Sequence, residues 1–264
     1  MKCFTVIIMA AALLMTCYAE EWESVVTDLT AEEMLDLCMD GIYHKDKPGA
    51  EPNLHDQCAQ WSNRSCCFSN VSEEIHDDGV WHDINWYHCG QNALSEECHK
   101  FLVQDSCFYE CSPNVGPWLV EHKISIRNER FVDVPLCASE CNAWWDACKD
   151  DMTCSDNWAK GWDWSSGTAS CPDDKPCRSF AEYFDNATNF CANLWGGSFK
   201  VVPDNDPDMP CMKMFWQDAE KNPNDEVAVY YANKKSVSGS VSLNIQSSLI
   251  YLTAALLLVQ LDAN

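Results

Sequence analysis

Basic residues are scarce in this chain of 264 residues: 17 Lys and Arg stand against 41 Asp and Glu, and the formal net charge at pH 7 is −24. Proteins that bind nucleic acids need cations to neutralise phosphates, so this composition excludes that class. The sequence also lacks a nucleophile elbow, a Walker loop, an HExxH motif and a dinucleotide-binding fingerprint. These absences favour a protein that is not an enzyme and uses no cofactor.

Long hydrophobic runs are missing too, because no stretch reaches the about 20 apolar residues of a membrane-spanning helix. Two shorter apolar blocks lie at the ends of the chain. At the N-terminus, Lys2 precedes the apolar stretch Val6–Met15, and Ala19 supplies the small residue that signal peptidase requires. We therefore predict a secretory signal peptide over residues 1–19.

The C-terminal apolar block, Leu249–Leu261, follows a polar spacer and the small residues of Ser236–Ser240. This order is the pattern of a glycosylphosphatidylinositol (GPI) attachment signal. We predict attachment at Ser238, with Ser236 as the second choice, a mature domain over residues 20–238 and a removed propeptide over residues 239–264. A secreted protein with an apolar tail is the alternative.

The 18 cysteines are typical of a disulfide-bonded secreted or cell-surface protein. Removal of the signal peptide takes away Cys3 and Cys17 and leaves an even number, which fits complete pairing. Cys66 and Cys67 are adjacent and need different partners, because neighbours cannot reach disulfide geometry without strain. The count of cysteines fixes no further connectivity.

Two CxxxC motifs, at Cys107 and Cys111 and at Cys137 and Cys141, fall within the spacing range of zinc ligands. No paired histidines follow at finger spacing, and the export signal directs the chain to an oxidising compartment. We therefore predict no metal site. Sequons predict surface N-glycosylation at Asn63, Asn70 and Asn186.

Capping signals and helical periodicity predict four helices joined by turn-rich loops. The helices begin at Thr30 with Glu33, at Ser95 toward Tyr109, after Pro135 toward Cys148, and at Asn222 toward Ala232. Strand signals are short, at Val80–Trp86 and Phe199–Val202. We find no repeat and no long linker. The sequence thus predicts a single helix-rich, disulfide-stapled globular α+β domain with short β-strands.

Two groups of residues are candidates for ligand binding. Trp158, Trp162 and Trp164 surround Lys160 and Gly161, and a purely structural aromatic run would need neither of these last two residues between its rings. The sequence therefore favours a ligand pocket here, although indoles at this density also suit a core.

The second group contains charged residues near an aromatic ring. Arg127 and Arg130 would share one face of a helix and could donate to an anion or a carbonyl group, although solvated surface arginines are the alternative. Asp105 and Tyr109 lie one turn apart on a predicted helix. Together they could hold a flat heterocycle, the carboxylate pairing with ring N–H donors while the phenol ring stacks. A structural acid near a core tyrosine is the other interpretation.

Several motifs resemble those of the folate receptor family, from about Cys38 to Ala232. They are Cys66-Cys67, NWYHCG at Asn85–Gly90, DSCFYECSPNVGPW at Asp105–Trp118, VPLC at Val134–Cys137, WWDAC at Trp144–Cys148 and NWAKGW at Asn157–Trp162. The resemblance implies an α+β fold with a deep pocket for a pterin-bearing ligand. It also implies the disulfides Cys38–Cys66, Cys58–Cys107, Cys67–Cys111, Cys89–Cys177, Cys98–Cys148, Cys137–Cys211, Cys141–Cys191 and Cys154–Cys171.

The resemblance further implies roles for individual residues. Asp105 matches the acid that binds the pterin nitrogens, Arg127 and Arg130 match donors to the pterin carbonyl side, and Ser198 matches a further hydrogen-bonding hydroxyl. Tyr109 and Trp195 match the rings on either side of the pterin. The other pocket residues implied are Trp86, Trp158, Trp162 and Trp164, with Lys160 and Gly161 near the glutamate tail of folate.

Four positions depart from the family pattern. His82 replaces a tyrosine, Ile84 a phenylalanine, Ile126 a tryptophan, and Ala159 a histidine near the glutamate carboxylates. The residues expected to recognise the pterin are retained. We keep His82 as a predicted ligand contact, and because an unperturbed histidine changes its charge near physiological pH, it is also a candidate pH sensor.

The resemblance implies a GPI-anchored receptor on the extracellular side of the cell surface. Such a receptor binds folic acid and reduced folates and delivers them into the cell by endocytosis. Two alternatives stay open: an adhesion protein on the same scaffold, with a protein partner on another cell, and a carrier of riboflavin or another flat heterocycle.

The short C-terminal block leads to a first prediction. Because it is too short to span a bilayer, retention at the cell surface should depend on a lipid anchor alone. A phospholipase C specific for phosphatidylinositol should release the protein from intact cells into the medium, as measured by immunoblot. Protein that stays cell-bound after treatment, or that is wholly in the medium without it, contradicts the anchor.

Overall fold

The computed structural model describes residues 2–5, 15–18, 22–77, 80–81, 83–91, 93–218 and 220–237.

Side-chain caps set the starts of two helices at the predicted places. Thr30 and Glu33 form a capping box before α1 (Ala31–Leu35), and the Ser95 hydroxyl caps α3 (Glu96–Cys111). Each cap accepts hydrogen bonds from N–H groups that the first helical turn leaves unpaired.

The other helices are short, apart from α4 and the last one. They are α2 (Ser69–His76), α4 (Ala138–Cys148), α5 (Phe180–Phe184), α6 (Ala187–Asn193), the 3₁₀ turns η1 (Asp56–Trp61) and η2 (Gly116–Trp118), and a C-terminal helix over residues 224–237. The helices predicted after Pro135 and Asn222 are confirmed. Asn222 accepts a hydrogen bond from the Asn224 N–H at 3.0 Å.

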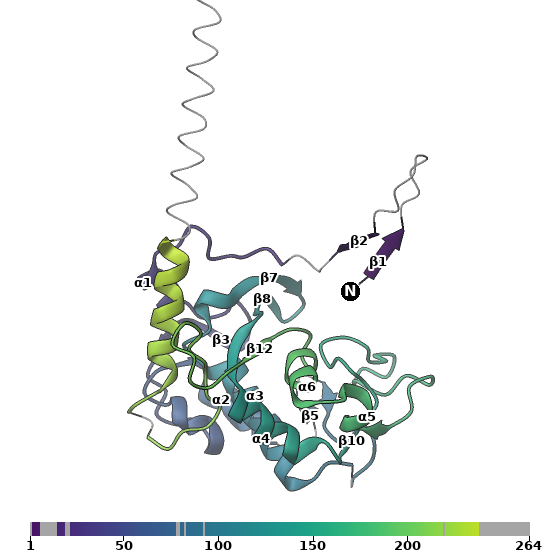
Figure 1. Ribbon diagram of the computed structural model, residues 1–264. Coiled ribbons are helices and arrows are strands. Elements are labelled where there is room, and N and C mark those ends of the chain that lie inside the picture. Colours follow the sequence, from purple (N-terminus) through teal and green to yellow (C-terminus); the bar gives the residue numbers. More distant parts are fainter. Residues whose placement is uncertain are drawn as a thin grey trace, which may run out of the picture.

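The described strands form pairs rather than one continuous sheet. Antiparallel pairs are β1 (Lys2–Thr5) with β2 (Met15–Tyr18), β3 (His44–Gly49) with β4 (Ser65–Cys67), β5 (Val80–Trp81) with β6 (Ile84–Asn85), β7 (Leu119–Ile124) with β8 (Arg127–Phe131), and β10 (Met152–Thr153) with β11 (Arg178–Ser179). β9 (Val134–Cys137) and β12 (Phe199–Val202) are parallel. Helices combined with short strands confirm the predicted α+β class (Figure 1).

The structure differs from the sequence predictions at two places. The strand expected over Val80–Trp86 is a tight hairpin, in which Asp83 turns the chain with a φ of 60°. Arg127 and Arg130 lie on strand β8 and not on a helix. Residues three apart on a regular strand point to opposite faces, but the pairing of β7 with β8 is irregular between Glu121 and Ile124, and such irregularities twist a hairpin.

Helices α3 and α4 lie side by side in the centre of the domain, with the β7–β8 hairpin at one end of α3 (Figure 1). The C-terminal helix, yellow in Figure 1, lies near α1 and packs on the segment after α3, where the rings of Trp118 and Tyr231 are 5.0 Å apart. A side chain at Gly116 would put its Cβ 1.9 Å from the Met34 carbonyl oxygen. The close contact between η2 and α1 therefore requires glycine.

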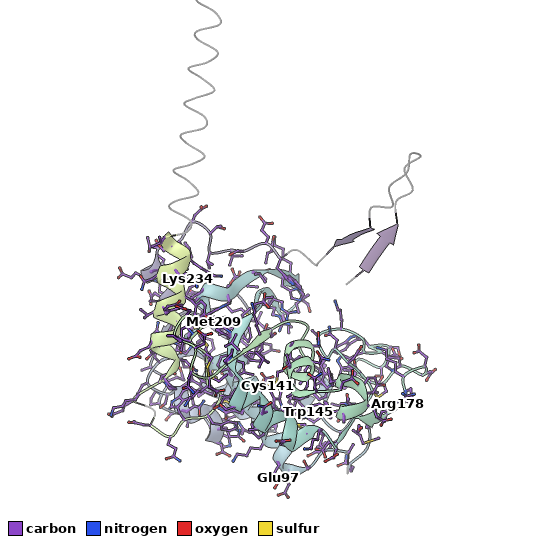
Figure 2. The ribbon with its side chains drawn as sticks, viewed as in Figure 1. Glu97, Cys141, Trp145, Arg178, Met209 and Lys234 are labelled. Atoms are coloured by element: carbon purple, nitrogen blue, oxygen red, sulfur yellow. A yellow bond between two sulfur atoms is a disulfide. The ribbon has the colours of Figure 1, made fainter. Side chains whose placement is uncertain are left out.

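Aromatic rings fill the core between α3, α4, β8 and β12. The Phe108 ring lies 6.0 Å from Phe131 and 5.5 Å from Phe199, and Trp144 lies 6.5 Å from Phe199. All four side chains are fully buried. Figure 2 shows side chains filling the space between the ribbons, with Cys141 and Trp145 labelled on α4.

Eight disulfides connect these elements, and each joins the pair of cysteines that the resemblance implied. Cys66 and Cys67 have different partners, as their adjacency required. The cysteines of both CxxxC motifs also pair outside their own motif. Their sulfurs therefore carry no free thiolate for a metal ion.

The ends of the chain are described only in part. β1 and β2 fall within the predicted signal peptide and lie away from the domain in Figure 1. Ser238 and the predicted propeptide lie outside the described residues, whereas Ser236 belongs to the C-terminal helix. No helix in the described ranges is long and apolar enough to cross a membrane. Asn63, Asn70 and Asn186 are exposed, and their glycosylation stays a prediction.

Candidate ligand-binding site

A cavity of about 140 Å³ opens between α3, β8 and the loop after α6. Most of its polar lining residues are buried, and these form its inner end: Asp105, Ser106, Glu110, Arg130 and Ser198. Among the described residues that line it, Ile124, Ala159 and Trp164 are exposed, so they mark where the cavity opens to solvent.

The Asp105 carboxyl is a buried polar group of the inner end. It lies on α3, is 3% exposed, and its Oδ1 has no hydrogen-bond partner among the described residues. Burial raises the pKa of Asp105 to about 8, with a smaller lowering by the Trp195 indole. The indole Nε1 of Trp195 has no other hydrogen-bond partner among the described residues. Near neutral pH the cavity therefore holds a largely protonated acid close to the Trp195 N–H donor.

The two arginines from β8 have different surroundings. Arg130 is buried and donates to the carbonyl oxygens of Trp195 and Gly196 at 2.6 and 3.1 Å, and to the Ser198 hydroxyl at 3.0 Å. Arg127 places its guanidinium 5.1 Å from the centre of the Tyr109 ring, and its buried Nε has no partner among the described residues. Arg130 therefore fixes the wall of the cavity, whereas Arg127 keeps a donor for a ligand.

The loop Trp195–Ser198 brings two of the predicted residues to the cavity. Gly196 and Gly197 have φ values of 58° and 88°, a left-handed conformation that glycine adopts without strain. The loop is fixed to the start of β9, where the Val134 N–H donates to the Ser198 carbonyl oxygen at 2.9 Å. The short turn thus places both the Trp195 ring and the Ser198 hydroxyl on the cavity wall.

Tryptophans form layers around and behind the cavity. Trp158 lines it and lies 5.6 Å from the Trp195 ring at an angle of 86°. Trp86 and Trp162 do not line it but are buried against Trp158, at 6.1 and 5.7 Å. His88 also contacts Trp158 and Trp162, and burial lowers its pKa. These residues support the position of Trp158.

Not every predicted residue lies at the cavity. The predicted residues that line the cavity are Asp105, Tyr109, Arg127, Arg130, Trp158, Trp164, Trp195 and Ser198. Three of the positions that depart from the family pattern also line it, namely Ile84, Ile126 and Ala159. Lys160 and Gly161 are exposed and are not among the lining residues. His82 lies outside the described residues, so its role as a ligand contact stays a prediction.

The sequence did not indicate a histidine–carboxylate pair at the cavity wall. Glu110 follows Tyr109 on α3, and its Oε2 lies 3.1 Å from Nε2 of His44, with the two side chains 1% and 3% exposed. His44 comes from the first residue of β3, far away in the sequence. The sequence offered one indication that Glu110 is buried, because its neighbours on the predicted helix are an aromatic residue and a cysteine.

A polar inner end, aromatic walls and a disulfide-linked frame are typical of a protein that binds small molecules. The chain belongs to the folate receptor family, a family of binding proteins whose model matches residues 37–213. It is 42% identical to human folate receptor alpha over 208 residues, which cover 78% of this chain and 80% of the relative. Identity with human folate receptor gamma is 41% over 201 residues, which cover 76% and 81%. Identity with the riboflavin-binding protein of Dromaius novaehollandiae is 37% over 181 residues, which cover 67% and 71%.

The raised pKa of Asp105 predicts that the ligand-free protein loses stability as the pH rises. Its folded pKa of about 8 exceeds the ordinary value, so at intermediate pH the folded state holds a proton that the unfolded state has released. The free energy of unfolding should then fall by up to about 1.4 kcal/mol per pH unit. Asp105→Asn does not titrate, and its stability relative to the parent should grow from pH 5 to pH 8 in urea denaturation.

The exposed Asp173→Asn variant is the control, and its difference from the parent should stay nearly constant over the same pH range. A gain in Asp105→Asn that is independent of pH would contradict the raised pKa.

Proposed function

We propose that this protein binds a folate through the pterin ring in the cavity between α3 and β8, and that it acts as a receptor at the cell surface. The observation that carries the proposal is the buried Asp105 carboxyl with its unpartnered oxygen. A buried polar group without a partner costs about 1–3 kcal/mol. A ligand that brings N–H donors to this point recovers that free energy.

The pterin ring has the hydrogen-bonding edge that this carboxyl needs. A ring N–H and an exocyclic amino group lie side by side on that edge, so one carboxylate can accept from both. Arg127 has a free Nε to donate toward the pterin carbonyl oxygen. Tyr109 and Trp195, which line the cavity, supply flat faces for stacking. Charge-assisted hydrogen bonds of this kind are stronger than neutral ones.

Riboflavin is the second candidate ligand, because two relatives are named riboflavin-binding proteins. The polar edge of its ring system has one N–H between two carbonyl oxygens. A carboxylate facing that edge gains one donor and meets two acceptors. A site built around Asp105 therefore favours a pterin, since an unmatched polar group strongly reduces affinity.

The ends of the chain support a place at the cell surface. The predicted signal peptide directs the chain to export, and the predicted GPI signal would retain it on the outer leaflet. Bound folate would then enter the cell by endocytosis with its receptor. The disulfide frame fits this extracellular location.

Titration of the purified protein with folic acid and with riboflavin, followed by tryptophan fluorescence, tests the proposal. Folic acid should bind more tightly than riboflavin. Asp105→Ala should weaken folic acid binding by about tenfold to a hundredfold, because it removes charge-assisted bonds worth about 1.5–3 kcal/mol. The melting temperature of the variant serves as the folding control.

Tighter binding of riboflavin would assign the site to the second candidate. Unchanged folic acid affinity in a folded Asp105→Ala variant would remove Asp105 from the site. Binding of neither compound would favour the adhesion alternative.

Folate binding should weaken as the pH falls. In the ligand-free protein the Asp105 carboxyl has a pKa of about 8, and pairing with pterin donors requires its ionised form. Binding below that pH therefore releases a proton, and the affinity falls by up to tenfold for each pH unit. We expect folic acid to bind at least about tenfold more weakly at pH 5 than at pH 7.4.

His82→Tyr separates a second contribution to this pH dependence. A ratio of affinities that is smaller in the variant than in the parent identifies His82 as a pH sensor. An equal ratio leaves the effect to Asp105 and excludes that role for His82. Equal affinity of the parent at the two pH values would refute pH-dependent release altogether.

A further inference from the structure

The segment that follows the predicted signal peptide lies antiparallel along β7, on the edge of that strand that does not face β8. The Glu121 N–H donates to the Glu23 carbonyl oxygen at 2.8 Å, and Ser24 forms an antiparallel bridge with Val120. Val26, two residues further on, is 2% exposed and belongs to the hydrophobic core. The N-terminal segment is therefore held to the hairpin by backbone hydrogen bonds and to the domain by a buried side chain.

Trp22 comes just before these contacts, and its ring lies against Arg130. The antiparallel register places Trp22 opposite His122, and the two rings are 5.6 Å apart at an angle of 67°. On the other side of β7, Val120 pairs with Arg130. Alternate residues of a strand share a face, so Trp22 and Arg130 lie on the same face of the hairpin. The guanidinium carbon of Arg130 is 5.1 Å from the centre of the Trp22 ring.

Arg130 connects this face to the loop after α6. It is 4% exposed, and it donates to the carbonyl oxygens of Trp195 and Gly196 and to the Ser198 hydroxyl. An aromatic ring attracts a guanidinium through its π-face and competes for none of its N–H donors. The Trp22 ring also covers the guanidinium from water, and hydrogen bonds are stronger where the local dielectric is low.

The position of Trp22 in the chain makes this contact specific to the present sequence. Trp22 precedes the part of the chain that the family model matches, which begins at residue 37. It is also the third residue after the predicted signal peptide, and residues this close to a chain end are ordered only when contacts hold them. Plain packing over the hairpin would be served by any large apolar side chain, whereas a contact with a cation requires an aromatic ring.

We propose that Trp22 is a positioning residue for the ligand site. Its ring holds the Arg130 guanidinium in the orientation that fixes the loop from Trp195 to Ser198, so the start of the predicted mature chain takes part in shaping the site. Trp22 is not among the residues that line the cavity and acts through Arg130 alone. The effect on ligand affinity rests on the proposed function, whereas the effect on Arg130 does not.

Two substitutions separate an aromatic contact from plain packing. Trp22→Leu keeps a large apolar side chain without a π-face, and it should weaken folic acid binding at pH 7.4 by about threefold to tenfold, the range expected when a cation–π contact is lost. Trp22→Phe keeps the π-face and should stay within about twofold of the parent. Equilibrium dialysis measures these affinities without relying on tryptophan fluorescence, which the substitutions change.

Phe68→Leu is the matched control. The Phe68 ring is 41% exposed and also lies against a cation, with Nζ of Lys45 5.8 Å from its centre, but it does not line the cavity. Loss of this second cation–π contact should leave the folic acid affinity within about twofold of the parent. The melting temperature of each variant serves as the folding control.

Labelling with phenylglyoxal, which modifies accessible guanidinium groups, tests the contact without any ligand. In Trp22→Leu the rate at which Arg130 is labelled should rise by about threefold or more, because the ring that covers and holds the guanidinium is gone. In Trp22→Phe and Phe68→Leu the rate should match the parent. Mass spectrometry of peptides reads each arginine separately, and the exposed Arg178 serves as an internal reference.

Unchanged folic acid affinity in Trp22→Leu would overturn the inference, whatever the labelling shows, and would leave the proposed function intact. Equal losses in Trp22→Leu and Trp22→Phe would also overturn it, because the aromatic face would then contribute nothing. If the parent does not bind folic acid, the proposed function itself fails. The labelling of Arg130 then decides by itself whether Trp22 holds this side chain.

Discussion

Three disulfides fasten helix α3 to different parts of the domain. Cys98 joins it to the end of α4, Cys107 to η1, and Cys111 to β4. Asp105 lies between the first and second of these points, in the part of the helix that is buried. Burial of an ionisable carboxyl without a partner is unfavourable, and a loosely held helix could relieve it by turning. The covalent frame prevents that movement, so the cavity keeps its unsatisfied inner end.

The remaining walls are positioned by that fixed helix. The Phe108 ring of α3 packs on Phe131 and Phe199, which belong to β8 and β12 and flank the arginine pair and the Trp195–Ser198 loop. Arg130 then connects β8 to that loop through backbone carbonyl oxygens. Preorganisation of this kind lowers the conformational cost of binding, because few groups must become ordered around the ligand.

Local patterns in the sequence predicted the local features well. The spacing of Asp105 and Tyr109 predicted one face of a helix, and both residues line the cavity on α3. The arginine pair needed the tertiary structure, since the same spacing fits a helix face and an irregular strand. The disulfide partners came from resemblance to a family, because cysteine spacing alone leaves many pairings open. The His44–Glu110 pair could not be predicted, because nothing local relates two residues on separate elements.

The connectivity of the disulfides has a consequence for biosynthesis. Among the disulfides of the described residues, only Cys154–Cys171 joins cysteines that follow one another along the chain, whereas the other seven pass over at least one intervening cysteine. A nascent chain emerges from its N-terminus, so early oxidation would pair Cys38 with Cys58 before either native partner has appeared. Such bonds must be exchanged through thiolate attack. We therefore expect the yield of native protein to depend on disulfide exchange.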